Sequence, residues 1–162
     1  MNVTTHEPGL AGLDSLQEVD ALCLFVGEDD RPLPGSAGYV DWRLCGALSR
    51  VLQSGFFVGA REDSLLLPTD GRFSVPRVFV MGLGQRRALE AGALGEALAA
   101  AGRVLTRARV EAVALELPGA GSLGEAARVS AFTERFLPSF KGRKVAVLAD
   151  KDVARLLPGR KG

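Results

Sequence analysis

The sequence predicts an α/β fold, a three-layer α/β/α sandwich around a mixed, mostly parallel sheet. Three observations support this prediction: short apolar runs, helical patterns between them, and one connection that lacks a helical pattern. The apolar runs occupy residues 21–26, 65–67, 78–81, 112–115 and 145–149, with a weaker one near Val3. They lack polar alternation, which is typical of strands covered by helices on both faces.

Amphipathic spacing predicts the helices that cover this sheet. Apolar residues recur at helical intervals over 36–54 and 89–107, in a third segment that begins at Ser122, and in a short segment at 152–157. Ser36 can cap the first helix and Gly55 can end it. Ser122 and Glu125 have the spacing of a capping box, in which each side chain satisfies a backbone donor of the first turn.

The connection between the runs at 65–67 and 78–81 contains turn residues, among them Asp70, Gly71 and Pro76. Such a loop allows the two strands to pair as neighbours, which makes the sheet mixed rather than wholly parallel. After this point helix and strand alternate. We therefore expect a single domain over residues 1–158, followed by a polar tail at 159–162.

Composition excludes several classes of function. The 20 basic and 19 acidic residues leave a net charge of +1, so the charge balance indicates no polyanion-binding surface. The N-terminus lacks the basic patch and apolar stretch of a secretory signal, and no later segment is long enough to span a bilayer. We therefore expect a cytoplasmic protein without a membrane contact.

Few residues of this chain have the chemistry for catalysis or metal binding. His6 is the only histidine and precedes the core in a segment that looks flexible, so a serine nucleophile has no evident base. Cys23 and Cys45 lack a paired metal-ligand spacing and are interpreted as small buried hydrophobes. The adjacent Asp29 and Asp30 are interpreted as solvated loop carboxylates. We predict no catalytic residue, no metal site and no cofactor.

Gly82, Leu83 and Gly84 are the best candidates for a ligand contact, together with Gly35. The turn at 82–84 follows a buried strand and precedes a helix, where α/β folds place phosphates against backbone amides. Arg87 stands where a Gly-x-Gly-x-x-Gly motif requires its third glycine. The competing interpretation is that the glycines only let the chain turn away from the sheet.

Six short strings occur in an order and at separations that resemble a known family. They are DALCLFV (20–26), LPG (33–35), GALSR (46–50), GFFVG (55–59), LLLP (65–68) and VFVMGLG (78–84). Together they look like the N-terminal domain of the leucyl aminopeptidase (cytosol aminopeptidase) family. The resemblance implies a macro-domain-like fold, which is otherwise known for binding ADP-ribose. In that family the metal ligands belong to a C-terminal domain, so no residue here inherits a catalytic role.

The function that these observations favour is a non-catalytic binding or assembly module, which acts through self-association or a protein partner. Tyr39 and Trp42 are candidate anchors for such a partner. The alternative is a macro-like module that binds a nucleotide or an ADP-ribose derivative at Gly35 and at 82–84. A regulatory DNA contact is the weakest alternative, because the basic clusters are interpreted as solvated surface: Arg103, Arg107, Arg109, Lys141, Arg143 and Lys144.

Overall fold

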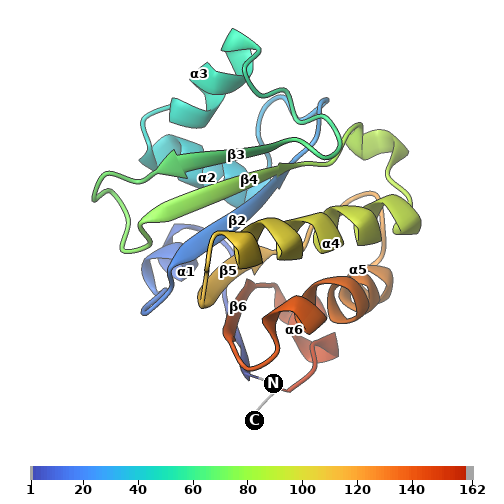
Figure 1. The fold of residues 1–162 in the computed structure, drawn as a ribbon. Helices are drawn as coiled ribbons and strands as arrows, with labels where there is room; N and C mark the ends of the chain where they lie inside the picture. The colour runs from blue at the N-terminus through green and yellow to red at the C-terminus, as the bar shows by residue number, and fades with distance from the viewer. Residues whose placement is uncertain (1, 160–162) are drawn as a thin grey trace.

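Six strands form one sheet at the centre of the computed structural model, which describes residues 2–159 (Figure 1). Every predicted apolar run, including the weak one near Val3, forms a strand of this sheet. The strand order across the sheet is β1-β6-β5-β2-β4-β3. The bounds are β1 (Asn2–His6), β2 (Ala21–Val26), β3 (Ser64–Pro68), β4 (Arg77–Gly82), β5 (Ala112–Glu116) and β6 (Lys144–Leu148).

The sheet is mixed and mostly parallel, as predicted. Neighbouring strands pair in parallel from β1 through β6, β5 and β2 to β4. Only β3 runs antiparallel to its neighbour β4, because the connection between them is a loop and not a helix. The carboxyl ends of the five parallel strands therefore meet at one edge of the sheet, which is where such folds place their ligand sites.

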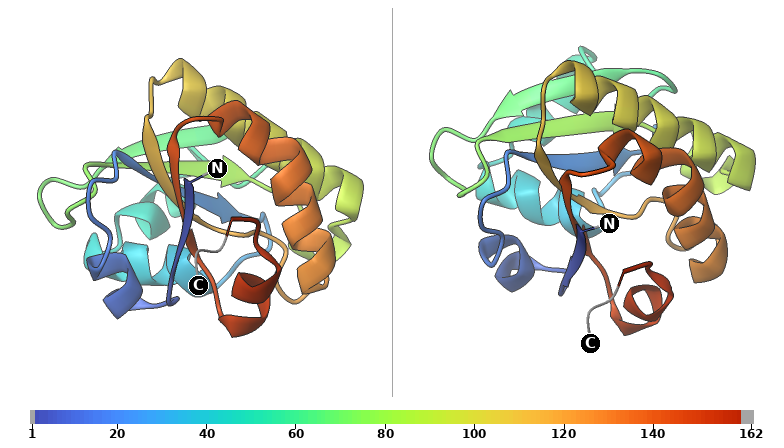
Figure 2. Two further views of the ribbon diagram at one scale, coloured as in Figure 1. Left: turned by 90° about the horizontal axis from the view of Figure 1, so that it is seen from below. Right: turned by 60° about the horizontal axis from the view of Figure 1, so that its bottom comes forward.

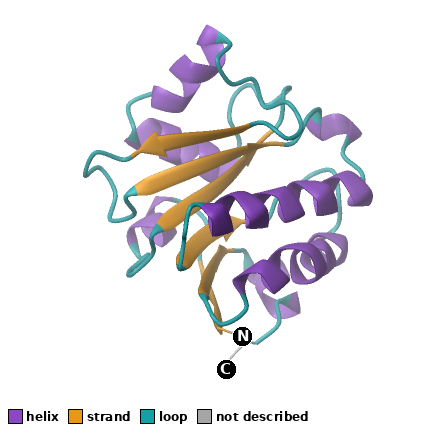
Figure 3. Cartoon of the chain, in the orientation of Figure 1, coloured by secondary structure: helices purple, strands orange, loops and turns teal. Residues whose placement is uncertain are grey.

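Helices cover both faces of the sheet, and this confirms the three-layer architecture (Figures 2 and 3). One face carries the first three helices, and the other carries the last three with the turns between them. The helices are α1 (Leu10–Asp14), α2 (Gly35–Arg43), α3 (Ala47–Ser54), α4 (Ala91–Arg107), α5 (Glu125–Ala131) and α6 (Lys151–Leu156). The five-residue α1 was not predicted.

Each interface between helices and sheet has its own apolar core. Under α1, α2 and α3 the core is aliphatic apart from one phenylalanine, with Leu22, Leu24 and Val80 contributed by the strands. Under α4 and α5 the core also contains aromatic rings. Phe132, Phe136 and Phe140 are fully buried, and successive ring centroids lie 5.5 and 5.0 Å apart in a stacked arrangement.

The helix predicted over 36–54 is two helices, because the chain breaks at residues 44–46. Cys45 and Gly46 both have positive φ, 55° and 81°, which ends α2 and starts α3 in a new direction. The Asp41 carboxylate then accepts a hydrogen bond from the Ser49 amide at 3.0 Å and satisfies a donor in the first turn of α3. Gly55 ends α3 with a φ of 77°, as predicted.

The predicted caps of two helices are wrong. Ser36 lies inside the first turn of α2, which Pro34 precedes as the capping residue. Helix α5 begins at Glu125 after Gly124, and the Ser122 hydroxyl donates instead to the Arg86 carbonyl at 2.9 Å. Beyond α5 the helix widens into a π-helical turn at Phe132–Phe136.

Two further expectations concern the ends of the chain and membranes. Of the polar tail predicted at 159–162, only Gly159 lies within the described residues. Within residues 2–159, no helix has both the length and the apolar character needed to cross a bilayer.

Candidate functional site at the carboxyl edge of the sheet

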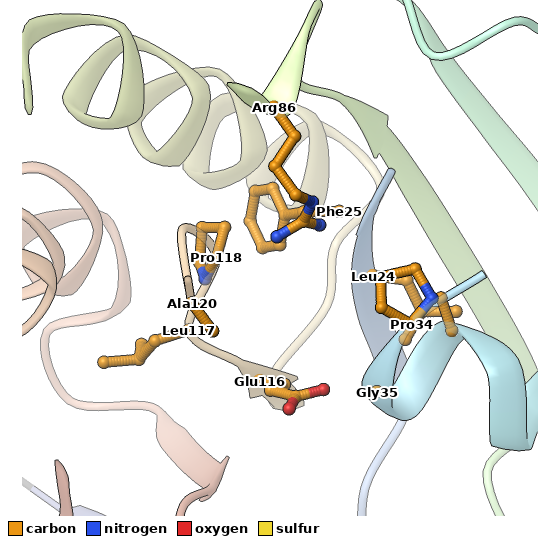
Figure 4. Close-up of a pocket in the computed structure, with 10 residues that line it drawn as sticks. Leu24, Phe25, Pro34, Gly35, Arg86, Glu116, Leu117, Pro118 and Ala120 are labelled. Atoms are coloured by element: carbon orange, nitrogen blue, oxygen red, sulfur yellow. The ribbon is translucent and has the colours of Figure 1, made fainter. Parts of the chain in front are cut away.

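Three loops meet at the carboxyl edge of the sheet: those that follow β2, β4 and β5. They surround a cavity of about 130 Å³ between the start of α2 and the end of β5 (Figure 4). Its lining residues are Leu24, Phe25, Pro34, Gly35, Ala37, Arg86, Glu116, Leu117, Pro118 and Ala120. Arg86 and Glu116 are the only charged groups among these, so they decide what the cavity can accept.

Arg86 is held by a buried carboxylate from the loop after β2. Asp30 is only 5% exposed and accepts from Arg86 through both oxygens, at 2.7 Å from Nε and 2.9 Å from Nη2. The same carboxylate accepts from the Gly27 amide at 2.7 Å. This bidentate pair joins the β2 and β4 loops, uses two of the five guanidinium N–H donors of Arg86 and balances its charge. The interpretation of Asp30 as a solvated loop residue is therefore wrong.

The neighbouring Asp29 carboxylate occupies the amides at the start of the next turn. It accepts from the Arg86 amide at 2.7 Å and from the Arg87 amide at 3.2 Å. The hydrogen bond from the Arg86 backbone amide is the largest cause that holds the pKa of Asp29 below its ordinary value. The hydrogen bond from the Arg87 amide and the charge of the Arg87 guanidinium act in the same direction. A carboxylate of the chain thus lies where a phosphate would contact these backbone donors.

A third carboxylate, Glu116, lies against the N-terminus of α2. Its Oε2 accepts from the Ser36 amide at 2.8 Å, and its position at the last residue of β5 fixes it there. Gly35 has a φ of 57° and faces the same carboxylate, since a Cβ on Gly35 would lie 2.8 Å from Oε2. The helix N-terminus, an ordinary anion site, is therefore occupied by Glu116. The Ser36 hydroxyl is buried without a hydrogen-bond partner.

The loop after β5 is fixed by a buried arginine. Arg128 is 7% exposed and donates to the carbonyls of Leu117 and Pro118, at 2.8 and 3.1 Å. Burial lowers the pKa of Arg128, and the nearby carboxylates, Glu116 first among them, partly oppose this. Arg128 therefore supports the wall of the cavity from behind and contributes positive potential to Glu116.

The structure brings only one of the four predicted ligand residues, Gly35, into this cavity. The amides of Gly82, Leu83 and Gly84 donate to the carbonyls of Asp63, Val26 and Gly59, at 2.9, 3.0 and 2.9 Å. A Cβ on Gly82 would lie within 2 Å of the Ala60 carbonyl oxygen, so the close crossing of two chain segments requires glycine there. Ligand binding at 82–84 stays a prediction, and its three amides already have partners.

The residues singled out for catalysis or metal binding lie apart. His6 belongs to β1 and not to a flexible segment, and its Nδ1 lies 2.8 Å from the Ser15 hydroxyl. Burial, and then Lys144, lower the pKa of His6. Cys23 is fully buried, which raises the pKa of its thiol, whereas Cys45 is exposed and not buried as predicted. No group of three or more His, Cys, Asp or Glu residues within 2–159 could hold a metal ion.

One of the two basic clusters is partly engaged within the protein. Arg143 pairs with Glu111 at 3.5 Å, and Lys144 donates to the Gln17 carbonyl at 2.8 Å. Arg143 also lies over the ring of Phe140. These contacts use part of the positive charge that a nucleic acid would otherwise meet.

Sequence reasoning missed the three carboxylates and Arg86 as a set. Asp29 and Asp30 are 56 to 58 residues from the Arg86 and Arg87 groups that they contact, and Glu116 is 80 residues from Ser36. Partners so distant leave no local pattern. One signal was present, because Glu116 is a charged residue directly after the buried run at 112–115.

The fold and this edge define the class of protein as a macrodomain-like α/β/α domain. A Trypanosoma brucei macrodomain in complex with ADP-ribose superposes with a TM-score of 0.73 at 10% identity, over 96% of this chain and 67% of that one. The macrodomain of Mycobacterium tuberculosis DarG gives 0.66 at 16% identity, over 92% and 98%. At these identities the likeness concerns the fold alone.

Within this class, residues 22–139 match the model of the cytosol aminopeptidase family, N-terminal domain, and the chain belongs to that family. A tomato leucine aminopeptidase superposes with a TM-score of 0.67 at 18% identity, over 97% of this chain and 34% of that one. A probable cytosol aminopeptidase of Syntrophotalea carbinolica is 34% identical over 102 residues, 62% of this chain. The one from Burkholderia multivorans is 32% identical over 96 residues, 59% of this chain. The matched regions cover 20% and 19% of these two relatives.

Proposed function

We propose that this chain is a non-catalytic binding and assembly module that acts by associating with a protein, either a second copy of itself or another chain. The observation that supports this most is the occupation of the carboxyl edge by the chain's own anions. Asp29, Asp30 and Glu116 accept from the amides and the guanidinium that a phosphate or a substrate carboxylate would use. An incoming anion must displace them against like-charge repulsion.

The size of the cavity supports the same proposal. Its volume of about 130 Å³ is below the roughly 300–1,000 Å³ of typical small-molecule pockets, whereas a second cavity of about 310 Å³ is lined by Gly82 and Leu83. Large apolar side chains instead lie on the outside of the molecule. Trp42 is 69% exposed and Tyr39 44% exposed, and both belong to α2. Exposed aromatic residues of this kind are favoured where one protein surface docks on another.

A second candidate function is the binding of a nucleotide or an ADP-ribose derivative at Gly35 and at 82–84. It is favoured by the position of Arg86 and Gly35 on the cavity wall and by the fold shared with the T. brucei macrodomain. For a diphosphate to enter, Glu116 must release the Ser36 amide. Replacement of Glu116 by glutamine removes this negative charge and keeps a hydrogen-bond acceptor.

Thermal unfolding with and without ADP-ribose separates the two candidates. A ligand that binds the native state raises Tm. Because the proposed function includes no binding of ADP-ribose, we expect no rise in Tm for the wild-type chain or for Glu116→Gln. A saturable rise for the wild-type chain would replace the first proposal by the second. A rise confined to Glu116→Gln would identify Glu116 as the group that excludes the ligand.

The non-catalytic part of the proposal has a separate test. Purified chain incubated with Zn²⁺ or Mn²⁺ and a chromogenic leucyl amide should release no product above the buffer control. Turnover that follows the chain through purification would overturn this part. The same purification from cells that do not express the chain serves as the control for a contaminating peptidase.

A further inference from the structure

Strand β3 forms one outer edge of the sheet, and its backbone orientation can be read from its two ends. The Asp63 carbonyl accepts from the Gly82 amide at 2.9 Å, and the Thr69 amide donates to the Pro76 carbonyl at 3.2 Å. Both flanking residues therefore direct their polar groups toward β4. Residues of an antiparallel strand alternate in this direction, so every second residue between 63 and 69 also faces β4.

The other three residues of β3, Ser64, Leu66 and Pro68, direct their backbone groups away from the sheet. Ser64 and Leu66 each offer an amide and a carbonyl, whereas Pro68 offers only its carbonyl. Proline is tolerated in a strand where its missing amide would have faced solvent, and its position agrees with this orientation. The Leu66 side chain is also 52% exposed, so apolar surface and unpaired backbone coincide at the centre of the strand.

Of the features with which natural proteins protect an exposed strand, the β3 edge has a proline, Pro68, but no charged side chain. Its sequence from Ser64 to Pro68 is SLLLP, without a charged residue. The opposite edge strand, β1, has the more polar sequence NVTTH.

We propose that a second copy of this chain docks on the β3 edge, antiparallel and about a two-fold axis at Leu66. This inference rests on the proposed function and names the partner. In this register the two Leu66 residues face each other and exchange backbone hydrogen bonds. Each Ser64 amide donates to the Pro68 carbonyl of the second copy. Because Pro68 has no amide hydrogen, the return bond to the Ser64 carbonyl is the only one missing from this pair.

The side chains fit the same register, which is why a second copy is the occupant. Leu66 packs on Leu66 on one face of the joined sheet, and Leu65 lies opposite Leu67 of the second copy on the other. The segments beyond the strand carry both signs, with Arg61, Glu62 and Asp63 before it and Asp70 and Arg72 after it. Antiparallel docking brings Glu62 beside Asp70 of the second copy, with Arg61 and Arg72 close by in sequence, so each end of the contact contains both signs. An isologous interface of this kind is the commonest among homo-oligomers.

The experiment is light scattering on size-exclusion fractions of the full chain, with charge swaps at the proposed axis. The wild-type chain should give twice its mass of 17.1 kDa at high micromolar concentration. Leu66→Lys or Leu66→Glu alone should weaken the dimer at least about tenfold, because equal charges then face each other across the axis. An equal mixture of the two variants should recover the dimer, because the axis pairs residue 66 of one copy with residue 66 of the other.

Leu156→Lys is the matched control, since it places the same charge at another exposed leucine, 49% exposed in α6, and should leave the dimer intact. A wild-type monomer at every concentration would overturn this inference and leave association with another protein standing. A dimer that survives Leu66→Lys and is lost in Trp42→Lys would also overturn it, while self-association stands. A mixture of the two Leu66 variants that stays monomeric would overturn the two-fold register.

Discussion

The carboxyl edge of the parallel strands and the outer edge at β3 differ in how their polar groups are satisfied. At the carboxyl edge, the amides of Gly27, Ser36 and Arg86 and the Arg86 guanidinium donate to carboxylates of the same chain. At β3, the outward backbone groups of Ser64 and Leu66 lie beside an exposed leucine side chain. The first region is complete within one chain, and the second becomes complete only when another strand is added.

The difference shows why the fold alone does not fix the function. The carboxyl edge is the part that a macrodomain-like fold would suggest for a ligand, yet here its donors have internal partners. Hydrogen-bonded charge pairs of this kind hold the loops together, and an external anion would have to displace them. The proposed recognition surface lies elsewhere, at the outer backbone edge of β3.

The largest effect should come from breaking the buried pair at the carboxyl edge. Asp30→Ala leaves the Arg86 guanidinium and the Gly27 amide without their acceptor, and we expect the free energy of unfolding to fall by about 3 kcal/mol. Urea denaturation measures this loss. Asp152→Ala, which removes an exposed ion pair with Arg155, is the control and should change little. A loss for Asp30→Ala no larger than for this control would show that the pair does not stabilise the edge.

Next in size is the effect of a methyl group at Gly35. Gly35→Ala adds the strain of a positive φ and pushes the Glu116 carboxylate off the Ser36 amide, at a combined cost of about 2 kcal/mol. Gly55→Ala is the matched control. Gly55 also has a positive φ, 77°, but an added Cβ would contact nothing, so this substitution should cost only the backbone strain, about 1 kcal/mol. In a Glu116→Ala background the two alanine substitutions should cost equal amounts. Equal costs already in the wild-type background would contradict the contact.

A smaller effect concerns pH. The folded-state pKa of Asp29 lies below its ordinary value of 3.8, so its contribution to stability is present above that pH and is lost as the pH falls through the folded-state pKa. We expect the difference in unfolding free energy between neutral and acidic solution to be smaller in Asp29→Asn. Urea titrations at a series of pH values give this difference. Identical pH profiles for the two chains would rule out the contribution.

The smallest effect on folding belongs to the β3 edge. Leu66→Lys changes an exposed side chain and no hydrogen bond to β4, so the unfolding free energy of the monomer should change by less than about 0.5 kcal/mol. Urea denaturation at low protein concentration measures the monomer. A large loss there would mean that Leu66 supports the sheet itself, and it would remove the contrast between the two regions.

Much of the fold was predictable because its signals are local. The six apolar runs, the loop between β3 and β4 and the long helix α4 each follow from residues adjacent in sequence. The break between α2 and α3 was missed because Cys45, a residue type that seldom adopts positive φ, precedes Gly46 there. The capping box at Ser122 failed because the Arg86 carbonyl, 36 residues away, competes for the hydroxyl.

The candidate site was less predictable because its contacts are non-local. Gly35, predicted as a ligand contact, lines the cavity at the carboxyl edge, but the sequence could not show that Glu116 lies against this residue. The glycine spacing at 82–84 marks a close crossing of chain segments, since the Gly82 position faces the Ala60 carbonyl. A glycine that admits a ligand and one that admits another backbone look alike in sequence.

The two cysteines differ in solvent exposure, so their reaction with a thiol reagent can report on opening of the sheet. Cys23 is fully buried in β2, whereas Cys45 is exposed at the break between α2 and α3. Trp42, the only tryptophan, is 69% exposed already, so its fluorescence changes little when the core opens. A thiol reagent such as a maleimide should therefore label the native chain once, at Cys45. The rate of the second labelling, at Cys23, then measures how often the centre of the sheet opens to solvent.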